Sequence, residues 1–177
     1  MIVNSASTVM TRRMNLGDIL LDGLFAGAIG AISVALWFLL LDGLAGRPFF
    51  TPALLGTVLL HGGSAAGQGV TVAPLPVAAY TAFHFLAFLA VGVGFSWLMT
   101  LFERFPIVGF VLLVVFVCLQ LGFFALNVAL GAELVGQLRA WTVVVANLLA
   151  AGSMSLYLWK RHPQIREALR HVWDQEA

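Results

Sequence analysis

Charged residues are scarce in this chain of 177 residues. Only 10% of its residues are Asp, Glu, Lys or Arg, whereas about a quarter is usual in a soluble domain. Apolar residues make up 61%, and the mean hydropathy is +0.99. Because so few charges cannot cover a 19.0 kDa globule with hydrophilic groups, the composition excludes a water-soluble fold. It predicts an integral membrane protein whose main partner is the lipid bilayer.

Cysteines and strongly basic surfaces are also lacking. The single cysteine, Cys118, lies inside an apolar run, which excludes an intrachain disulfide framework and every CxxC metal or redox motif. The formal net charge is only +1, and the basic residues stand in small groups at the ends of apolar runs. The chain therefore lacks the charge that binding to DNA or RNA requires, and we expect no nucleic-acid partner.

Sequence motifs of catalysis are missing as well. The chain has neither an HExxH zinc pair nor a GxSxG nucleophile elbow, and its glycine-rich segments at 62–69 and 92–94 do not fit a phosphate-binding loop. Asp18 and Asp22 share one helical face, but a metal-dependent phospholipid transferase would need further acidic residues. We therefore predict no catalytic and no metal-ligating residues, and interpret the two aspartates as a helix start that water reaches.

Four long apolar stretches are present. A transmembrane helix needs about 20 mostly apolar residues to cross about 30 Å of hydrocarbon. The stretches that meet this requirement are 23–41, 77–102, 107–130 and 140–159. Short connections between the last three make them antiparallel neighbours. The sequence thus predicts an all-α polytopic membrane protein, a single domain over 1–177 with four transmembrane helices in an up-down bundle.

Two further segments are predicted to be helices that do not cross the membrane. The apolar piece 52–60 is about half the required length, and with Thr51 as its N-cap it predicts a short interfacial helix on the outer side. Pro74 and Pro76 are then expected to stop and redirect the chain before the second span. Apolar residues recur at helical spacing over 163–175, which predicts a cytoplasmic amphipathic helix that lies on the membrane or docks onto a partner.

The distribution of Lys and Arg predicts the orientation, because these residues tend to stay on the cytoplasmic side. Seven of them precede the first span, lie between the second and third, or follow the fourth, and two lie in the other connections. Both termini are therefore expected in the cytoplasm, with the inner membrane of a bacterium as the expected location. The seven are Arg12, Arg13, Arg104, Lys160, Arg161, Arg166 and Arg170, and the two are Arg47 and Arg139.

Small residues predict where the helices approach closely. Helices that are already in lipid gain little from burying apolar surface against each other, so close packing at small residues drives much of their association. The first span repeats Gly23, Gly27 and Ala31 at intervals of four, and the second carries Ala90 and Gly94. We expect these five residues to form a helix-packing seam within the chain, and Gly92 with Ser96 is a second pair of small residues in the second span. The alternative is a docking face for a second copy or for another membrane subunit.

His84 is the ionisable residue that lies inside a predicted span, and such residues are functional candidates by default. One hypothesis is a polar layer in the bundle, in which neutral His84 bonds to Gln120, Asn127 or Asn147 of the third and fourth spans and fixes their register. The other is that His84 is an axial ligand of a haem or chlorophyll-type pigment, with His61 as the second ligand from the same side.

The leading functional hypothesis is a non-enzymatic accessory or assembly subunit that packs against a larger membrane complex, with other membrane subunits as its partners. A haem- or pigment-binding protein that uses His84 is one alternative, and no cofactor is expected otherwise. A small-solute transporter is the other alternative. Proton-coupled transport usually needs a carboxylate buried within a span, and we expect none in the four spans.

Overall fold

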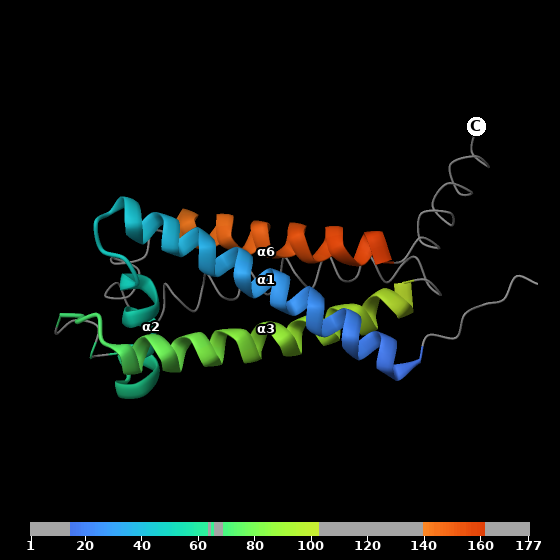
Figure 1. The fold of residues 1–177 in the computed structure, drawn as a ribbon, viewed down its shortest axis with the longest axis horizontal. Coiled ribbons are helices and arrows are strands. Elements are labelled where there is room, and N and C mark those ends of the chain that lie inside the picture. The colour runs from blue at the N-terminus through green and yellow to red at the C-terminus, as the bar shows by residue number, and fades with distance from the viewer. Residues whose placement is uncertain (1–14, 64, 66–68, 103–139, 162–177) are drawn as a thin grey trace, which may run out of the picture.

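The structure is a computed structural model that describes residues 15–63, 65, 69–102 and 140–161. In this part the helices are α1 (Leu16–Leu44), α2 (Phe50–His61), α3 (Pro74–Phe102) and α6 (Ala140–Arg161). Figure 1 shows α1, α3 and α6 as long helices that lie together, with the short α2 at one end of them. The predicted span at 107–130 and the predicted helix at 163–175 lie outside the described residues.

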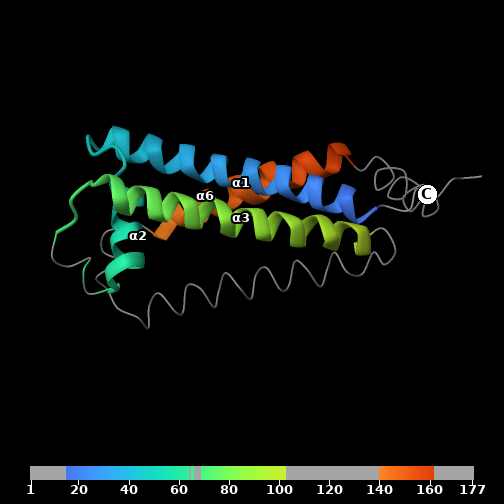
Figure 2. The same cartoon turned by 60° about the horizontal axis from the view of Figure 1, so that its bottom comes forward.

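Three of these helices are long and apolar enough to cross a membrane, namely α1, α3 and α6. In both Figure 1 and Figure 2, α1 runs antiparallel to α3 and α6, so that the start of α1 lies at the same end as the last turns of the other two. At 12 residues, α2 is too short to cross. The described part is therefore all-α and consistent with a membrane protein.

The helices extend beyond the predicted spans. α1 begins at Leu16 and ends at Leu44, whereas the predicted span is 23–41, so this helix includes both Asp22 and Asp42. α3 begins at Pro74, so Pro74 and Pro76 lie in its first turn and not in a turn of the chain before the helix, as had been expected. The missing N–H of proline has no helical partner in a first turn in any case, so a helix tolerates proline there.

The contact between α1 and α3 depends on glycine. A Cβ atom added at Gly92 of α3 would overlap the backbone of Gly23 and Gly27 in α1, and a Cβ at Gly27 would overlap the carbonyl group of Phe88. The two backbones therefore touch directly, without side chains between them. Such an approach maximises dispersion contacts between helices in lipid.

The predicted seam residues divide between contact and surface. Ala31 is fully buried in α1, and Gly23 and Gly27 lie against α3. Ala90, however, is exposed, and no atom of the described residues lies within 4 Å of a Cβ at Gly94. Gly92 takes their place, because two positions along a helix turn a residue to nearly the opposite face.

α6 packs against the other side of α1 through two small apolar clusters. One contains Ala26 with Met154 and Leu158, and the other contains Val34 with Ala146 and Ala150. Two hydrogen bonds add to this interface: the indole N–H of Trp37 donates to the carbonyl oxygen of Thr142 at 2.9 Å, and the hydroxyl of Ser33 donates to that of Ser153 at 3.1 Å.

Gly92→Ala and Gly94→Ala form a matched pair of tests for the crossing. The first adds a methyl group where the α1 backbone lies, and we expect it to destabilise the protein by about 1–3 kcal/mol because the helices must move apart. The second adds the same methyl group where no described atom is near, and the better helix propensity of alanine should leave stability equal or raised by up to about 1 kcal/mol. Thermal unfolding in detergent measures both, and equal effects would contradict the glycine crossing.

Candidate functional site

A cavity of about 220 Å³ lies between α1, the start of α2 and α3. α2 closes one end of it and is held tightly against α3, since a Cβ at Gly56 would overlap the carbonyl group of Pro76. Leu39 and Phe49 line the cavity and are exposed, so it reaches the surface of the described part. Its walls include Phe38, Asp42, Phe49, Tyr80, His84 and Phe85.

His84 lies on the α3 wall of this cavity and is only 9% exposed. Its Nε2 lies 3.2 Å from the carbonyl oxygen of Ala31 in α1. Because a carbonyl oxygen only accepts, Nε2 must carry the hydrogen, and Nδ1 of the neutral ring is then an acceptor. The ring of Phe88 lies 4.7 Å from the imidazole and that of Tyr80 lies 5.6 Å away, measured between centroids. The histidine therefore links α3 to the α1 backbone, and within the described residues Nδ1 has no hydrogen-bond partner.

Asp42 lies near the end of α1, on the same cavity, and is 7% exposed. Its Oδ2 accepts the backbone N–H of Thr51 at 2.7 Å, and its Oδ1 accepts the hydroxyl of Thr51 at 2.8 Å. The prediction that Thr51 is the N-cap of this helix is thus wrong. α2 starts at Phe50 after Phe49, whose φ is 64°, and a carboxylate from α1 satisfies the free N–H of the first turn.

Asp42 is a buried carboxylate of α1 that directly follows the predicted span 23–41. The predicted span stopped one residue before this aspartate, because a charged residue was taken as its boundary. The helix instead continues, since the N-terminus of α2 supplies both hydrogen bonds and the positive end of a helix dipole. Sequence reasoning missed this role. The only available signal was a threonine shortly after a turn, with no indication of which distant group would pair with it.

The predicted polar layer is only partly within the described residues. Gln120 and Asn127 lie outside them. Asn147 is half-buried in α6 and has an interaction of its own, while the hydrogen bond of His84 goes to the carbonyl oxygen of Ala31. A backbone carbonyl as acceptor was not among the predicted partners, because sequence patterns do not indicate which carbonyl a close helix crossing will expose.

The geometry around His84 is unfavourable for a haem or chlorophyll-type pigment. Pockets for drug-sized ligands usually measure roughly 300–1,000 Å³, and a porphyrin or chlorin ring is at least as large as such a ligand. The cavity of about 220 Å³ is smaller than these pockets. His61, the predicted second ligand, is the exposed last residue of α2 and does not line the cavity. Within the described ranges, no three His, Cys, Asp or Glu side chains gather as a metal site.

A second carboxylate contact lies at the opposite end of α1. Asp22 is 6% exposed and accepts hydrogen bonds from Arg161 of α6, at 2.8 Å from Nη2 and 2.9 Å from Nε. The hydroxyl of Tyr157 lies 3.5 Å from the same carboxylate oxygen. The interpretation of Asp22 as a water-exposed helix start is therefore wrong. Arg161 covers it. The charge pattern of the sequence did not identify this arginine, which follows the fourth predicted span, as the partner of Asp22.

Comparison of the chain with protein-family models, with curated proteins and with solved structures finds no match. Function must therefore be argued from the residues of the chain itself, since an all-α membrane fold alone does not specify an activity.

Removal of the carboxylate at Asp42 should release α2. We expect Asp42→Ala to lower stability by about 1–2 kcal/mol, the usual loss when a capping side chain is replaced by alanine. Asp42→Asn should retain most of the stability of the wild type, because the amide oxygen still accepts the N–H of Thr51. Thermal unfolding in detergent measures the difference, and equal losses in both variants would contradict the capping role.

Arg161→Gln should lower the midpoint of thermal unfolding, because it removes the cation that covers the nearly buried carboxylate of Asp22. Lys160→Gln is the matched control, since it removes the same charge from the neighbouring exposed position. If the ion pair of Asp22 with Arg161 stabilises the packing of α1 on α6, the unfolding midpoint in low salt should decrease more in Arg161→Gln than in Lys160→Gln. The same decrease in both variants would reduce the effect to general surface charge.

Proposed function

We propose that this protein is an integral membrane accessory or assembly subunit that packs against a larger membrane complex. One observation carries the proposal: the polar side chains at membrane depth whose partners are known bind other parts of the same chain. His84 bonds to Ala31, Ser33 to Ser153, and Trp37 to Thr142. These bonds hold helices together, as expected of a scaffold, and leave few polar groups for a reaction.

The outward face of α3 supports the same proposal. Large apolar side chains on this face are more than half exposed, and Phe83 and Trp97 are each 55% exposed. Ala90 and Gly94 lie between them on the same face of the helix. Small residues flanked by aromatic rings allow another transmembrane helix to approach closely. Lipid tails would cover such a face less well than a helix whose side chains fit between the rings.

The proposal includes four crossings in a bacterial inner membrane, with both termini in the cytoplasm. α3 finishes at the end of the bundle opposite to the start of α6 (Figure 2), which supports a fourth crossing between them. The apolar stretch 107–130 is long enough for that crossing. Lys160 and Arg161 then end α6 on the side that the positive-inside rule assigns to the cytoplasm.

Native purification in a mild detergent, followed by mass spectrometry, tests the proposed role. We expect companion membrane proteins in fixed stoichiometry with the chain. Ala90→Leu should reduce their recovery at least about tenfold without lowering thermal stability, because a leucine at this exposed position would keep the partner helix from approaching closely. This corresponds to a loss of about 1.4 kcal/mol of binding energy.

Ala82→Leu is the matched control, because Ala82 is exposed on the same helix but lies about 80° around it from Ala90. Companions that are recovered equally with both variants would exclude the α3 face, and purification of the chain alone would contradict the proposed function. The spectrum of the same preparation tests the pigment alternative, which requires an absorption band that is lost in His84→Ala.

A further inference from the structure

We propose that the cavity between α1, α2 and α3 binds a small organic ammonium ion, with Asp42 as its counter-charge and aromatic rings as its walls. This inference does not depend on the proposed accessory role. The argument rests on the charge of Asp42, the aromatic rings that line the cavity and the size of the cavity.

The charge of Asp42 is only partly balanced within the protein. Both hydrogen bonds to the carboxylate come from Thr51, which is neutral, and in the described residues no basic side chain forms an ion pair with Asp42. The start of α2 contributes roughly half a positive charge. A carboxylate that is 7% exposed at the edge of a membrane is usually paired with a cation, so a full positive charge nearby would be favourable.

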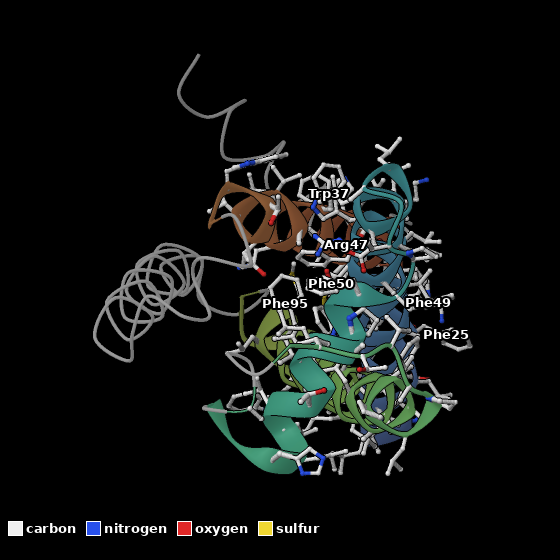
Figure 3. The ribbon with its side chains drawn as sticks, turned by 90° about the vertical axis from the view of Figure 1, so that its left-hand side faces the viewer. Phe25, Trp37, Arg47, Phe49, Phe50 and Phe95 are labelled. Atoms are coloured by element: carbon white, nitrogen blue, oxygen red, sulfur yellow. The ribbon has the colours of Figure 1, made fainter. Side chains whose placement is uncertain are left out.

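Arg47 does not provide that charge, although it follows closely in sequence. Its backbone N–H donates to the carbonyl oxygen of Asp42 at 2.9 Å, while its guanidinium lies over the ring of Phe50, 4.0 Å from the centroid. Figure 3 shows Arg47 beside Phe50, with Phe49 directed to a different side. Phe49 lines the cavity, so the arginine is engaged away from it.

Four aromatic rings line the cavity from three parts of the chain: Phe38 of α1, Phe49 before α2, and Tyr80 and Phe85 of α3. The face of an aromatic ring attracts a cation within about 6 Å, and the attraction strengthens when water is excluded. A carboxylate beside several rings is a combination that favours ammonium groups over neutral or anionic ones. An anion would be repelled by Asp42 and by the ring faces alike.

His84 lines the other end of the cavity. Its imidazole is held at Ala31, about 16 Å before Asp42 along the α1 axis, so an ammonium group at Asp42 does not reach it, and the rest of the ligand would extend toward it. The cavity volume of about 220 Å³ limits the ligand to the amine and one ring or a short chain. Two sources share this chemistry: a free arylalkylamine, or the ethanolammonium headgroup of a phospholipid that reaches the cavity from the surface.

The phenethylammonium ion is the probe for the free amine, and 2-phenylethanol is its neutral counterpart. In maltoside detergent at neutral pH, we expect the cation to raise the unfolding midpoint of the full chain by several degrees, since a ligand that binds only the folded state stabilises it. The alcohol should give a much smaller shift. Asp42→Asn, which keeps the α2 cap, should weaken the apparent affinity for the cation at least about tenfold.

Asp18→Asn is the matched control, because it removes the same charge from the other end of α1, and it should leave the affinity unchanged. Phe38→Leu, which removes the ring one turn before Asp42 on α1, should weaken binding of the cation more than binding of the alcohol. Equal binding of the cation and the alcohol, or unchanged affinity in Asp42→Asn, would overturn the proposal and leave a cavity that only takes apolar guests.

Native mass spectrometry of the protein with added phosphatidylethanolamine or phosphatidylglycerol distinguishes the two sources. Retention of phosphatidylethanolamine by the wild type and its loss in Asp42→Asn would identify the lipid headgroup as the ligand. A response to the free amine without lipid retention would identify a soluble amine. Failure of both arms would refute the ammonium site, whereas recovery of companion proteins is measured separately and tests the accessory role alone.

Discussion

The backbone contact between α1 and α3 determines most of the architecture around it. Because Gly23, Gly27 and Gly92 carry no side chains, the two helices approach until their main chains touch. This approach brings the imidazole of His84 to the carbonyl oxygen of Ala31 and sets the width of the cavity beside it. The end of α1 then lies close enough to α2 for Asp42 to accept both hydrogen bonds of Thr51. A bulkier crossing would separate His84 from the carbonyl oxygen of Ala31.

The arrangement in which α1 contacts all the other described helices also explains why its two buried aspartates lie at its ends. Each carboxylate meets the terminus of a neighbour: Asp42 meets the start of α2, and Asp22 meets the last residue of α6. In the hydrocarbon core such charges would be strongly unfavourable. At the ends of the helix, these carboxylates can be stabilised by the hydrogen-bond donors of a helix start or by an arginine that reaches water.

Much of this fold was predictable because hydropathy alone identifies long apolar helices, and α1, α3 and α6 follow the predicted segments closely. The exact ends were not, since charged residues and prolines look like boundaries until their partners are known, as Asp42 and Pro74 demonstrate. His84 was recognised from its depth in the span, but its acceptor was a backbone carbonyl that no side-chain pattern reveals. Gly92 was noted among the small residues of the span, but spacing alone did not show that Gly92, and not Ala90 or Gly94, lies on the face toward α1.

The two sides of α1 differ in how they resist movement. Against α3 the main chains interlock at glycines, and any sliding would drive Cα atoms into one another. Against α6 the contacts are made by side chains: apolar clusters, hydrogen bonds such as that of Ser33 with Ser153, and the ion pair of Asp22 with Arg161 at one end. A conformational change that moves α6 along α1 would therefore have to break this ion pair, while α1 and α3 would move as one rigid pair.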